Sequence, residues 1–202
     1  MPGPHDIFSE DPIQDPIALF DAWLSEAHAS EPNDPNAAAL ATSTATGAPS
    51  VRMVLVKRIG NHRFCFFTNV ESRKGRELTE NPRAALCFHW KSLRRQIRVE
   101  GTVSELSASD TDTYFHSRSR ASQISAAISD QSRPVATREE LEQRVRIFNE
   151  EHPGEVPRPD YWRGFHLHAT QIEFWINGAD RLHDRFLFTR KADGWHKTRL
   201  YP

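Results

Sequence analysis

Alternation between apolar and polar residues recurs along much of the chain and predicts a protein built mainly of β-strands. The alternating segments are short, and turn-forming pairs such as Thr46-Gly47 and Gly60-Asn61 separate them. Strands are predicted at residues 37–44, 51–58, 63–69, 83–90, 94–106, 164–176, 183–190 and 195–200. Such a series, with only interspersed helices, indicates an antiparallel arrangement rather than a parallel α/β sheet.

Helical signals occupy three other regions. Asp15-Pro16 supplies a cap and a first-turn proline, and an apolar stripe at helical spacing follows, made of Leu19, Phe20, Trp23, Leu24 and Ala27. A second helix is expected at residues 72–80, where Asn81-Pro82 ends it, and residues 109–151 are expected to be mostly helical. We therefore expect a flexible N-terminal arm at residues 1–14 and a single domain at residues 15–202, folded as a β-barrel or rolled sheet with helices at its ends.

The composition narrows the class of protein. A chain of 202 residues is long enough for a real core, and its 26 basic and 27 acidic residues argue against a nucleic-acid partner. No apolar run approaches the roughly 20 residues that would span a membrane. Cys65 and Cys87 lie in apolar segments and are expected to be buried thiols, which suits the cytoplasm.

The segment from Gln171 to Arg185 carries the first candidate chemistry. A half-buried strand leads into the turn pair Asn177-Gly178, and Arg181, His183 and Arg185 then alternate. If the chain continues extended, these three side chains lie on one side, where a bound anion would offset their repulsion. A solvated basic edge strand is the alternative interpretation.

Other basic residues suggest phosphate binding. Ser72-Arg73-Lys74 opens a helix, whose free N–H groups favour an anion, although a basic helix surface is the commoner meaning. Arg52 and Lys57 differ in strand parity, so we expect them on opposite faces, either binding ligands or reaching the sheet edge.

A further polar stripe is predicted on a helix. Tyr114, Arg118 and Ser122 are spaced i, i+4, i+8, which suits a phosphate monoester or, alternatively, a solvated face. Gln96 and Gln131-Ser132 add amides that can bind the edge of a heterocycle, although solvated glutamines are common.

Metal and covalent hydrolytic chemistry are not expected. His166 and His168 share one strand face, but no cysteine or carboxylate with metal-ligand spacing accompanies them, so we predict no metal. The chain also lacks a Gly-x-Ser-x-Gly motif and a cysteine paired with an evident base.

Taken together, these motifs resemble the pyridoxamine (pyridoxine) 5′-phosphate oxidase family from about Asp15 to Pro202. The resemblance is carried, in the family's order, by Arg52-Met-Val-Leu-Val-Lys57, Phe67-Thr-Asn69, Ser72-Arg-Lys74, Arg95-Gln96, Tyr114-Phe-His-Ser-Arg118, Ser122-Gln123, Gln131-Ser132, Glu173-Phe-Trp175 and Arg181-Leu-His-Asp-Arg185. Each motif alone is weak evidence for this family, but the occurrence of all of them in the family's order is specific to it.

The resemblance implies a mainly β protein with α-helices, an FMN-binding split β-barrel that works as a homodimer with FMN at the subunit interface. By family likeness, FMN would be bound by Arg52, Met53, Val54, Leu55, Val56, Lys57, Phe67, Thr68, Arg73, Lys74, Gln96, Gln131, Ser132, Trp175 and Arg185. The substrate phosphate would be bound by Lys57, Tyr114, Arg118 and Ser122. Arg181 and His183 would cover the substrate ring near the reacting carbon, as the catalytic pair.

The reaction implied is transfer of a hydride from C4′ of pyridoxamine or pyridoxine 5′-phosphate to the flavin, which O2 reoxidises with formation of hydrogen peroxide. Pyridoxal 5′-phosphate is the product, with ammonia from the amine, in vitamin B6 biosynthesis and salvage. The alternatives are a related split-barrel oxidase acting on another aromatic compound, such as a phenazine precursor, a non-catalytic carrier of FMN or pyridoxal phosphate, and a plain structural β-barrel.

Overall fold

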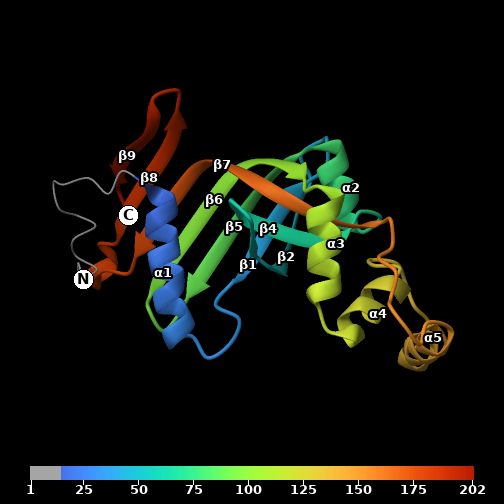
Figure 1. The fold of residues 1–202 in the computed structure, drawn as a ribbon. Coiled ribbons are helices and arrows are strands. Elements are labelled where there is room, and N and C mark those ends of the chain that lie inside the picture. The colour runs from blue at the N-terminus through green and yellow to red at the C-terminus, as the bar shows by residue number, and fades with distance from the viewer. Residues whose placement is uncertain (1–14) are drawn as a thin grey trace.

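The computed structural model describes residues 15–202, so the arm predicted at residues 1–14 lies outside the described residues. The chain folds into one antiparallel sheet with helices around it (Figure 1). The strands are β1 (Ala37–Ser43), β2 (Pro49–Leu55), β3 (Lys57–Ile59), β4 (His62–Asn69), β5 (Arg83–Trp90), β6 (Arg95–Glu105), β7 (Trp162–Ile176), β8 (Asp184–Lys191) and β9 (Gly194–Leu200). The helices are α1 (Pro16–Ser30), α2 (Arg73–Glu80), α3 (Ala108–Ser117), α4 (Arg120–Ile128), α5 (Arg138–Glu151) and the short 3-10 helix η2 (Ala179–Arg181).

The sheet is curled, because its two ends are joined by a single residue. The strand order is β2-β1-β5-β6-β7-β4-β3, with β8 paired to β7 and β9 paired to β8. Strands β2 and β3 stand at opposite ends of this order, yet only Val56 separates them in sequence. The sheet must therefore bend until its ends approach each other, as in a split barrel. The prediction of one strand at residues 51–58 is wrong for this reason: its first part pairs with β1 and its last part with β4.

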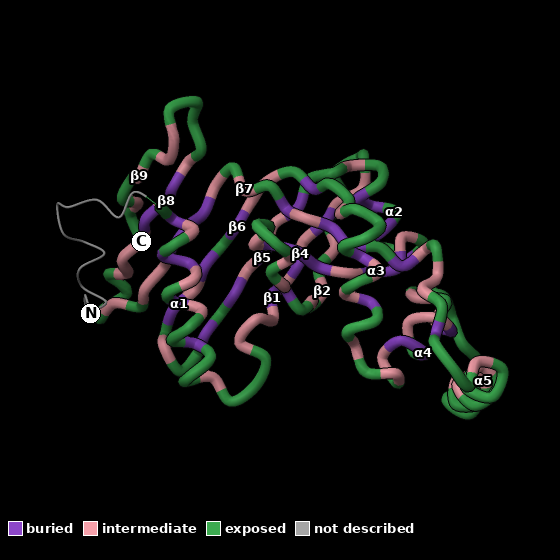
Figure 2. Tube along the Cα trace, in the orientation of Figure 1, coloured by how far each residue is buried: buried purple, intermediate pink, exposed green. Residues whose placement is uncertain are grey.

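Helix α1 covers the interior of the curled sheet with aromatic side chains. Phe20 packs edge-on against Phe64 and Phe88, at ring distances of 4.9 and 5.2 Å. Trp23 meets Phe174 edge-on at 5.1 Å. Edge-to-face contacts of this kind suit the charge distribution of the rings. Figure 2 shows buried residues along β5, β6 and β7, which confirms that the core lies over the central strands.

The helical region after β6 consists of three helices rather than one long stretch. Helix α3 ends at Ser117, and Arg118 has extended backbone angles, φ −79° and ψ 158°. Ser119 then caps α4 through its side chain. The prediction that Tyr114, Arg118 and Ser122 form a line on one helical face is therefore wrong, because the helix breaks between the first two residues and the third.

The connection between β7 and β8 is also more compact than the sequence suggests. Residues 179–181 form the 3-10 helix η2, and Asp180 and Arg181 have positive φ values of 52° and 64°. The predicted extended alternation of Arg181 with His183 and Arg185 is wrong because of this turn. A Cβ atom on Gly178 would lie 1.9 Å from the carbonyl oxygen of Leu182, so the turn requires glycine there.

The two cysteines are free. Cys65 is buried as predicted, whereas Cys87 is only half-buried, because its strand face is less covered. In the described part of the chain, no helix is long and apolar enough to cross a membrane.

Candidate functional site

A cavity of about 330 Å³ lies where β2 and β4 meet the helices α2, α3 and α4. Many of the residues that the sequence singled out contribute to its walls. These are Met53, Val54, Leu55, Phe67, Thr68, Lys74, Tyr114, Arg118 and Gln131. The structure adds Asn69, which the sequence had named only within a motif, and residues that sequence reasoning missed, namely Ser125, Ala126, Ser129 and Trp162.

One wall of the cavity is a stack of aromatic rings. Phe67 lies parallel to Tyr114 and Trp162, with ring centroids 4.0 and 5.0 Å away. Gly164 pairs with Phe67 across the sheet, and a Cβ atom there would come within 2.6 Å of the Phe67 ring. The glycine therefore leaves the space in which the stack forms. Nothing in the sequence marked Trp162, because it follows a proline-rich segment without a periodic pattern.

Arg118 completes this wall as a cation that has no counterion among residues 15–202. Its guanidinium carbon lies 4.9 Å from the centre of the Trp162 ring. Its Nη1 atom is buried and has no hydrogen-bond partner among residues 15–202. Burial lowers the pKa of Arg118, and it raises the pKa of the neighbouring Tyr114 hydroxyl. A buried donor without a partner is costly, and an anion with oxygen acceptors would satisfy it.

Lys74 supplies a second cation to the cavity. Its Nζ donates to Oε1 of Gln131 at 2.6 Å, to Oγ1 of Thr68 at 2.9 Å and to Oγ of Ser72 at 3.4 Å. Burial, assisted by the nearby charge of Arg52, lowers the pKa of Lys74 to about 8. The partners of Lys74 are thus neutral oxygens, which leave its charge uncompensated.

The cavity therefore has a clear electrostatic character. Its described lining includes Lys74 and Arg118 but no aspartate or glutamate. Two partly desolvated cations without a carboxylate favour an anionic ligand, and the flat aromatic wall favours a ring.

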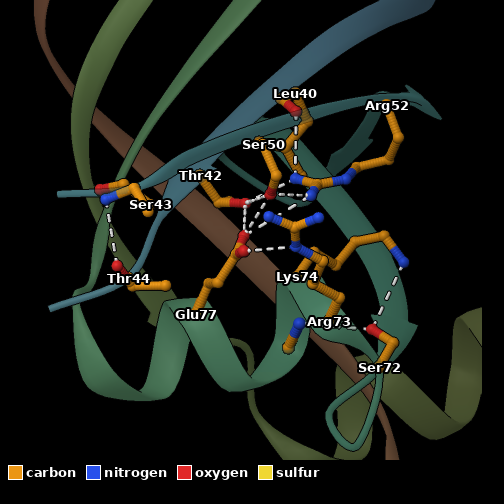
Figure 3. Close-up of polar contacts among 12 residues, drawn as sticks. Leu40, Thr42, Ser43, Thr44, Ser50, Arg52, Ser72, Arg73, Lys74 and Glu77 are labelled. Carbon is orange, nitrogen blue, oxygen red and sulfur yellow. Dashed lines mark hydrogen bonds and ion pairs between the residues drawn. The ribbon is translucent and has the colours of Figure 1, made fainter. Parts of the chain in front are cut away.

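A second basic group lies next to this cavity, at the start of α2. The Ser72 side chain caps the helix by accepting from the backbone N–H of Gly75, as predicted for a capped helix. Arg52 and Arg73 both reach the buried carboxylate of Glu77 (Figure 3). Sequence reasoning missed Glu77, although its position four residues after Arg73 in a predicted helix is a signal for such a pair.

Besides Arg52 and Arg73, four other predicted residues on this side of the molecule do not line the cavity in a single chain. Lys57 borders a different cavity, next to Phe20 and Asp21, although it pairs with Cys65 and so shares the sheet face of Phe67. Three others do not face this cavity because of where their side chains lie. Val56 is buried in the core, Ser122 accepts a hydrogen bond from Ser119 at 2.9 Å, and Ser132 is exposed with φ 72°.

The remaining predicted residues lie on β6, β7, β8 and the turn at η2. They are Gln96, Trp175, Arg181, His183 and Arg185. Figure 1 places β8 and β9 at one end of the molecule and α3 and α4 at the other. One chain therefore carries two separate groups of predicted site residues.

Part of this second group is closely packed. Gln96 and Trp175 are opposite each other in the register of β6 and β7. The rings of Trp175 and His183 lie 4.6 Å apart, and Nδ1 of His183 accepts from the backbone N–H of Gly178 at 3.1 Å. In the described part of the chain, that hydrogen bond leaves Nε2 as the ring nitrogen without a hydrogen-bond partner. Arg181 is exposed.

The histidines of β7 form a cluster rather than a metal centre. His166 lies 4.3 Å from His168 and 4.4 Å from His62, measured between ring centroids. Burial, followed by the charges of these two neighbours, lowers the pKa of His166 to about 4. Among residues 15–202, no three His, Cys, Asp or Glu side chains are grouped so that they could hold a metal ion.

Comparison with known proteins gives consistent matches over nearly the whole chain. Residues 24–150 match the profile of pyridoxamine 5′-phosphate oxidase, and residues 162–202 match that of the pyridoxine 5′-phosphate oxidase C-terminal dimerisation region. The chain is 56% identical over 189 residues to a pyridoxine/pyridoxamine 5′-phosphate oxidase of Gluconobacter oxydans, covering 93% of this chain and 94% of the relative. It is also 56% identical over 199 residues to a protein of the same name from Erythrobacter litoralis, covering 96% and 94%.

A solved structure confirms the split-barrel fold. PhzG from Burkholderia lata, crystallised with tetrahydrophenazine-1-carboxylic acid, superposes with a TM-score of 0.91 at 32% identity, covering 100% of this chain and 98% of that one. The fold, the order of the motifs and these matches agree. The chain belongs to the pyridoxamine 5′-phosphate oxidase family.

Proposed function

We propose that this protein is an FMN-dependent oxidase that converts pyridoxamine 5′-phosphate or pyridoxine 5′-phosphate with O2 to pyridoxal 5′-phosphate and hydrogen peroxide, and releases ammonia from the amine. The observation that carries this proposal is the pair of desolvated cations, Lys74 and Arg118, in a cavity whose described lining has no carboxylate. The names of the relatives support the same activity.

The residues around α2 fit the phosphate of FMN. Arg73 and Lys74 follow the cap Ser72, so side-chain charge and free backbone N–H groups favour an anion at one point. We assign the flavin to Arg52, Met53, Val54, Leu55, Val56, Lys57, Phe67, Thr68, Arg73, Lys74, Gln131 and Ser132 of one subunit, with Gln96, Trp175 and Arg185 of the other. When bound, FMN would supply the hydride acceptor and pass the electrons to O2.

The substrate phosphate fits the opposite, aromatic side of the cavity. Tyr114 and Arg118 present a hydroxyl and an unpaired guanidinium nitrogen there. Lys57 and Ser122 are assigned to the same phosphate, which requires their side chains to turn toward the cavity. Arg181 and His183 would touch the substrate ring and hold its reacting carbon in position, so that orientation contributes much of the rate.

A homodimer completes this assignment. The second group of residues is remote from the cavity in one chain, and Trp175, Arg181, His183 and Arg185 all fall within the region that matches the dimerisation profile. On β2, the apolar side chains of Val51, Met53 and Leu55 are exposed by 67%, 63% and 47%. Three neighbouring apolar residues on one face of an edge strand are typical of a subunit interface. We place the enzyme in the cytoplasm, where free thiols persist.

The decisive experiment uses purified protein, a visible spectrum and a peroxide-coupled assay. The proposal expects a yellow protein that releases hydrogen peroxide with pyridoxine phosphate or pyridoxamine phosphate. A yellow protein that makes no peroxide with either compound would indicate a carrier. A colourless protein that does not take up added FMN would contradict the proposal entirely.

A second candidate is an oxidase that acts on another aromatic compound. The structural similarity to PhzG in complex with tetrahydrophenazine-1-carboxylic acid favours keeping it. Such a substrate has no phosphate for Tyr114 and Arg118 to bind. Equal turnover of pyridoxine and pyridoxine phosphate would therefore favour this candidate, whereas a strong preference for the phosphate ester supports the first.

A further inference from the structure

A buried carboxylate lies beneath the basic group at the start of α2. Glu77 is only 4% exposed, and Figure 3 shows polar groups converging on it from β1, β2 and α2. Its Oε2 accepts from the hydroxyl groups of Thr42 and Ser50 at 2.5 Å each. Its Oε1 accepts from Nε of Arg73 at 2.9 Å, and Nη2 of Arg52 lies 3.5 Å from Oε2. The carboxylate is thus fully engaged by neighbouring donors.

The two hydroxyl groups also connect Glu77 to Arg52. Nη1 of Arg52 donates to Oγ1 of Thr42 at 2.5 Å, and Nη2 donates to Oγ of Ser50. Each hydroxyl therefore accepts from the arginine and donates to the carboxylate. Nη1 also reaches the backbone oxygen of Leu40 at 3.2 Å, which fixes the plane of the guanidinium group.

The charge on Glu77 is essential to this arrangement. Burial alone would raise the pKa of Glu77, but hydrogen bonds from Ser50, Thr42 and Arg73 outweigh it and bring the pKa to about 2. Burial lowers the pKa of Arg52, and the nearby charge of Arg73 lowers it further, so the two cations repel each other. An ionised carboxylate between them offsets that repulsion.

Arg73 is anchored in a way that leaves it able to bind. Its contact with Glu77 uses Nε, and its terminal nitrogens have no hydrogen-bond partner among the described residues. Its side chain is 60% exposed, whereas that of Arg52 is 21% exposed. One end of the Arg73 guanidinium is therefore fixed, and the other end is free to face an anion.

We propose that Glu77 is a positioning residue for the flavin phosphate: it holds Arg52 and Arg73 side by side so that both are oriented before the phosphate arrives. This inference rests on the proposed function, because it takes the phosphate of FMN as the anion. It assigns to Glu77 no contact with the flavin. Preorganised donors bind more tightly because less side-chain freedom is lost on binding.

A carboxylate near a phosphate also has an opposing effect, since like charges repel. Two guanidinium groups and one carboxylate leave a net charge of +1, whereas removal of the carboxylate would leave +2. The positioning role therefore predicts the opposite sign from simple electrostatics. Positioning predicts weaker FMN binding without Glu77, and charge alone predicts tighter binding.

The test compares FMN with riboflavin, which has the same ring and ribityl chain but no phosphate. Full-length protein stripped of flavin is titrated with each compound, and quenching of flavin fluorescence gives the two Kd values. For Glu77→Gln we expect the Kd of FMN to rise at least about tenfold, as for loss of a charge-assisted hydrogen bond, and the Kd of riboflavin to change less than about twofold.

Two further variants separate position from charge. Glu77→Asp keeps the charge but withdraws it by one methylene group, so it should also weaken FMN selectively, whereas a pure charge effect would leave the Kd as in the parent. Glu80→Gln is the matched control, because Glu80 is exposed at the end of the same helix and has no polar partner among residues 15–202. It should leave both Kd values unchanged.

The outcomes are distinct. Parental protein without any preference for FMN over riboflavin would contradict the phosphate cradle, and with it the proposed function. If Glu77→Gln prefers FMN over riboflavin as strongly as the parent does, or more strongly, only the role of Glu77 would be overturned. If Glu77→Gln does not fold, Thr42→Val and Ser50→Ala each remove one link to Arg52 and should lower the preference for FMN; an unchanged preference in both would overturn the proposal.

Discussion

Both carboxylate oxygens of Glu173 are bound by one guanidinium group: Nε of Arg185 donates to Oε1 at 2.8 Å, and Nη2 donates to Oε2 at 3.1 Å. Glu173 is 3% exposed, and Arg98 approaches the same carboxylate at 3.4 Å. Glu173 is therefore the counterpart of Glu77 in the second group of site residues. Each of the two groups contains a buried carboxylate that holds two arginines.

Loss of this carboxylate should destabilise the protein, because Arg185 would lose its ion-pair partner and keep only its hydrogen bond to the backbone oxygen of Tyr201 among the residues described. For Glu173→Gln we expect the free energy of unfolding to fall by about 3 kcal/mol, measured by urea denaturation. Glu100→Gln is the control, since Glu100 also binds Arg98 but is 43% exposed, and a change below about 1 kcal/mol is expected there. Equal stability of the two variants would contradict the interpretation.

Arg118→Ala should act mainly on substrate affinity. We expect KM for pyridoxine phosphate to rise by about two orders of magnitude while kcat changes much less, because an interaction with the non-reacting phosphate contributes to binding. The measurement is the peroxide-coupled assay. Arg146→Ala, which removes an exposed arginine on α5, should change KM less than about twofold. A comparable loss for unphosphorylated pyridoxine would argue against a phosphate contact.

Arg181→Ala should lower kcat as well as affinity, by about tenfold or more, because this side chain is assigned to hold the reacting ring in position. Steady-state kinetics at saturating substrate would measure it. The neighbouring Leu182 is 72% exposed and offers a control in Leu182→Ala, for which no change in kcat is expected. A normal kcat in Arg181→Ala would remove Arg181 from the catalytic assignment.

Acid should destabilise the fold through His166. Its pKa in the folded protein is about 4, below the ordinary value of 6.5, because burial and the neighbouring imidazoles disfavour its charged form. Between pH 6.5 and 4 the unfolded chain binds a proton that the folded chain does not, so the free energy of unfolding decreases as the pH falls through this window. Above pH 6.5 His166 is neutral in both the folded and the unfolded chain, so it causes no loss of stability there.

Melting temperatures between pH 7.5 and 4 would check this expectation. His166→Asn should show a smaller decrease over that range than the parent, whereas His89→Asn, at an exposed position on β5, should follow the parent. Parallel curves for all three proteins would exclude His166 as the cause.

Gly178→Ala should disturb the turn that carries Arg181 and His183. Its Cβ atom would meet the carbonyl oxygen of Leu182 at 1.9 Å, so the backbone must move. We expect a loss of about 2 kcal/mol in stability together with a lower kcat. Gly154→Ala is the control, because nothing lies within 4 Å of its Cβ position, and it should be close to neutral. Unaltered kinetics in Gly178→Ala would show that the turn tolerates this movement.

Local patterns predicted most of the strands, because one face of each strand is buried and alternation reports that face. The break at Val56 was not predictable in this way. Leu55 precedes it and Lys57 follows it without a glycine or proline to mark a turn, so only pairing with opposite ends of the sheet separates β2 from β3. Similarly, spacing alone placed Arg118 on a helix, but the cap at Ser119 begins a new one.

The site could be predicted to the extent that its residues occur in ordered motifs. Lys74, Tyr114, Arg118 and Phe67, all named from such motifs, line one cavity. Glu77 was not singled out, and Glu173 was named only as part of a motif and given no role, because an acidic residue in a helix or strand is usually a solvated one. Their importance comes from burial and from the arginines that reach them, both of which depend on the tertiary fold.

The single residue between β2 and β3 has a consequence for the way in which ligand binding and folding are linked. Arg52 precedes Val56 and Lys57 follows it, so the two sides of the barrel's open joint are contributed by one short stretch of backbone. A molecule bound by residues on both sides would fasten that joint and protect it from opening. Tight binding of a ligand there should therefore raise the temperature at which the protein unfolds, and opening of the joint should release the ligand.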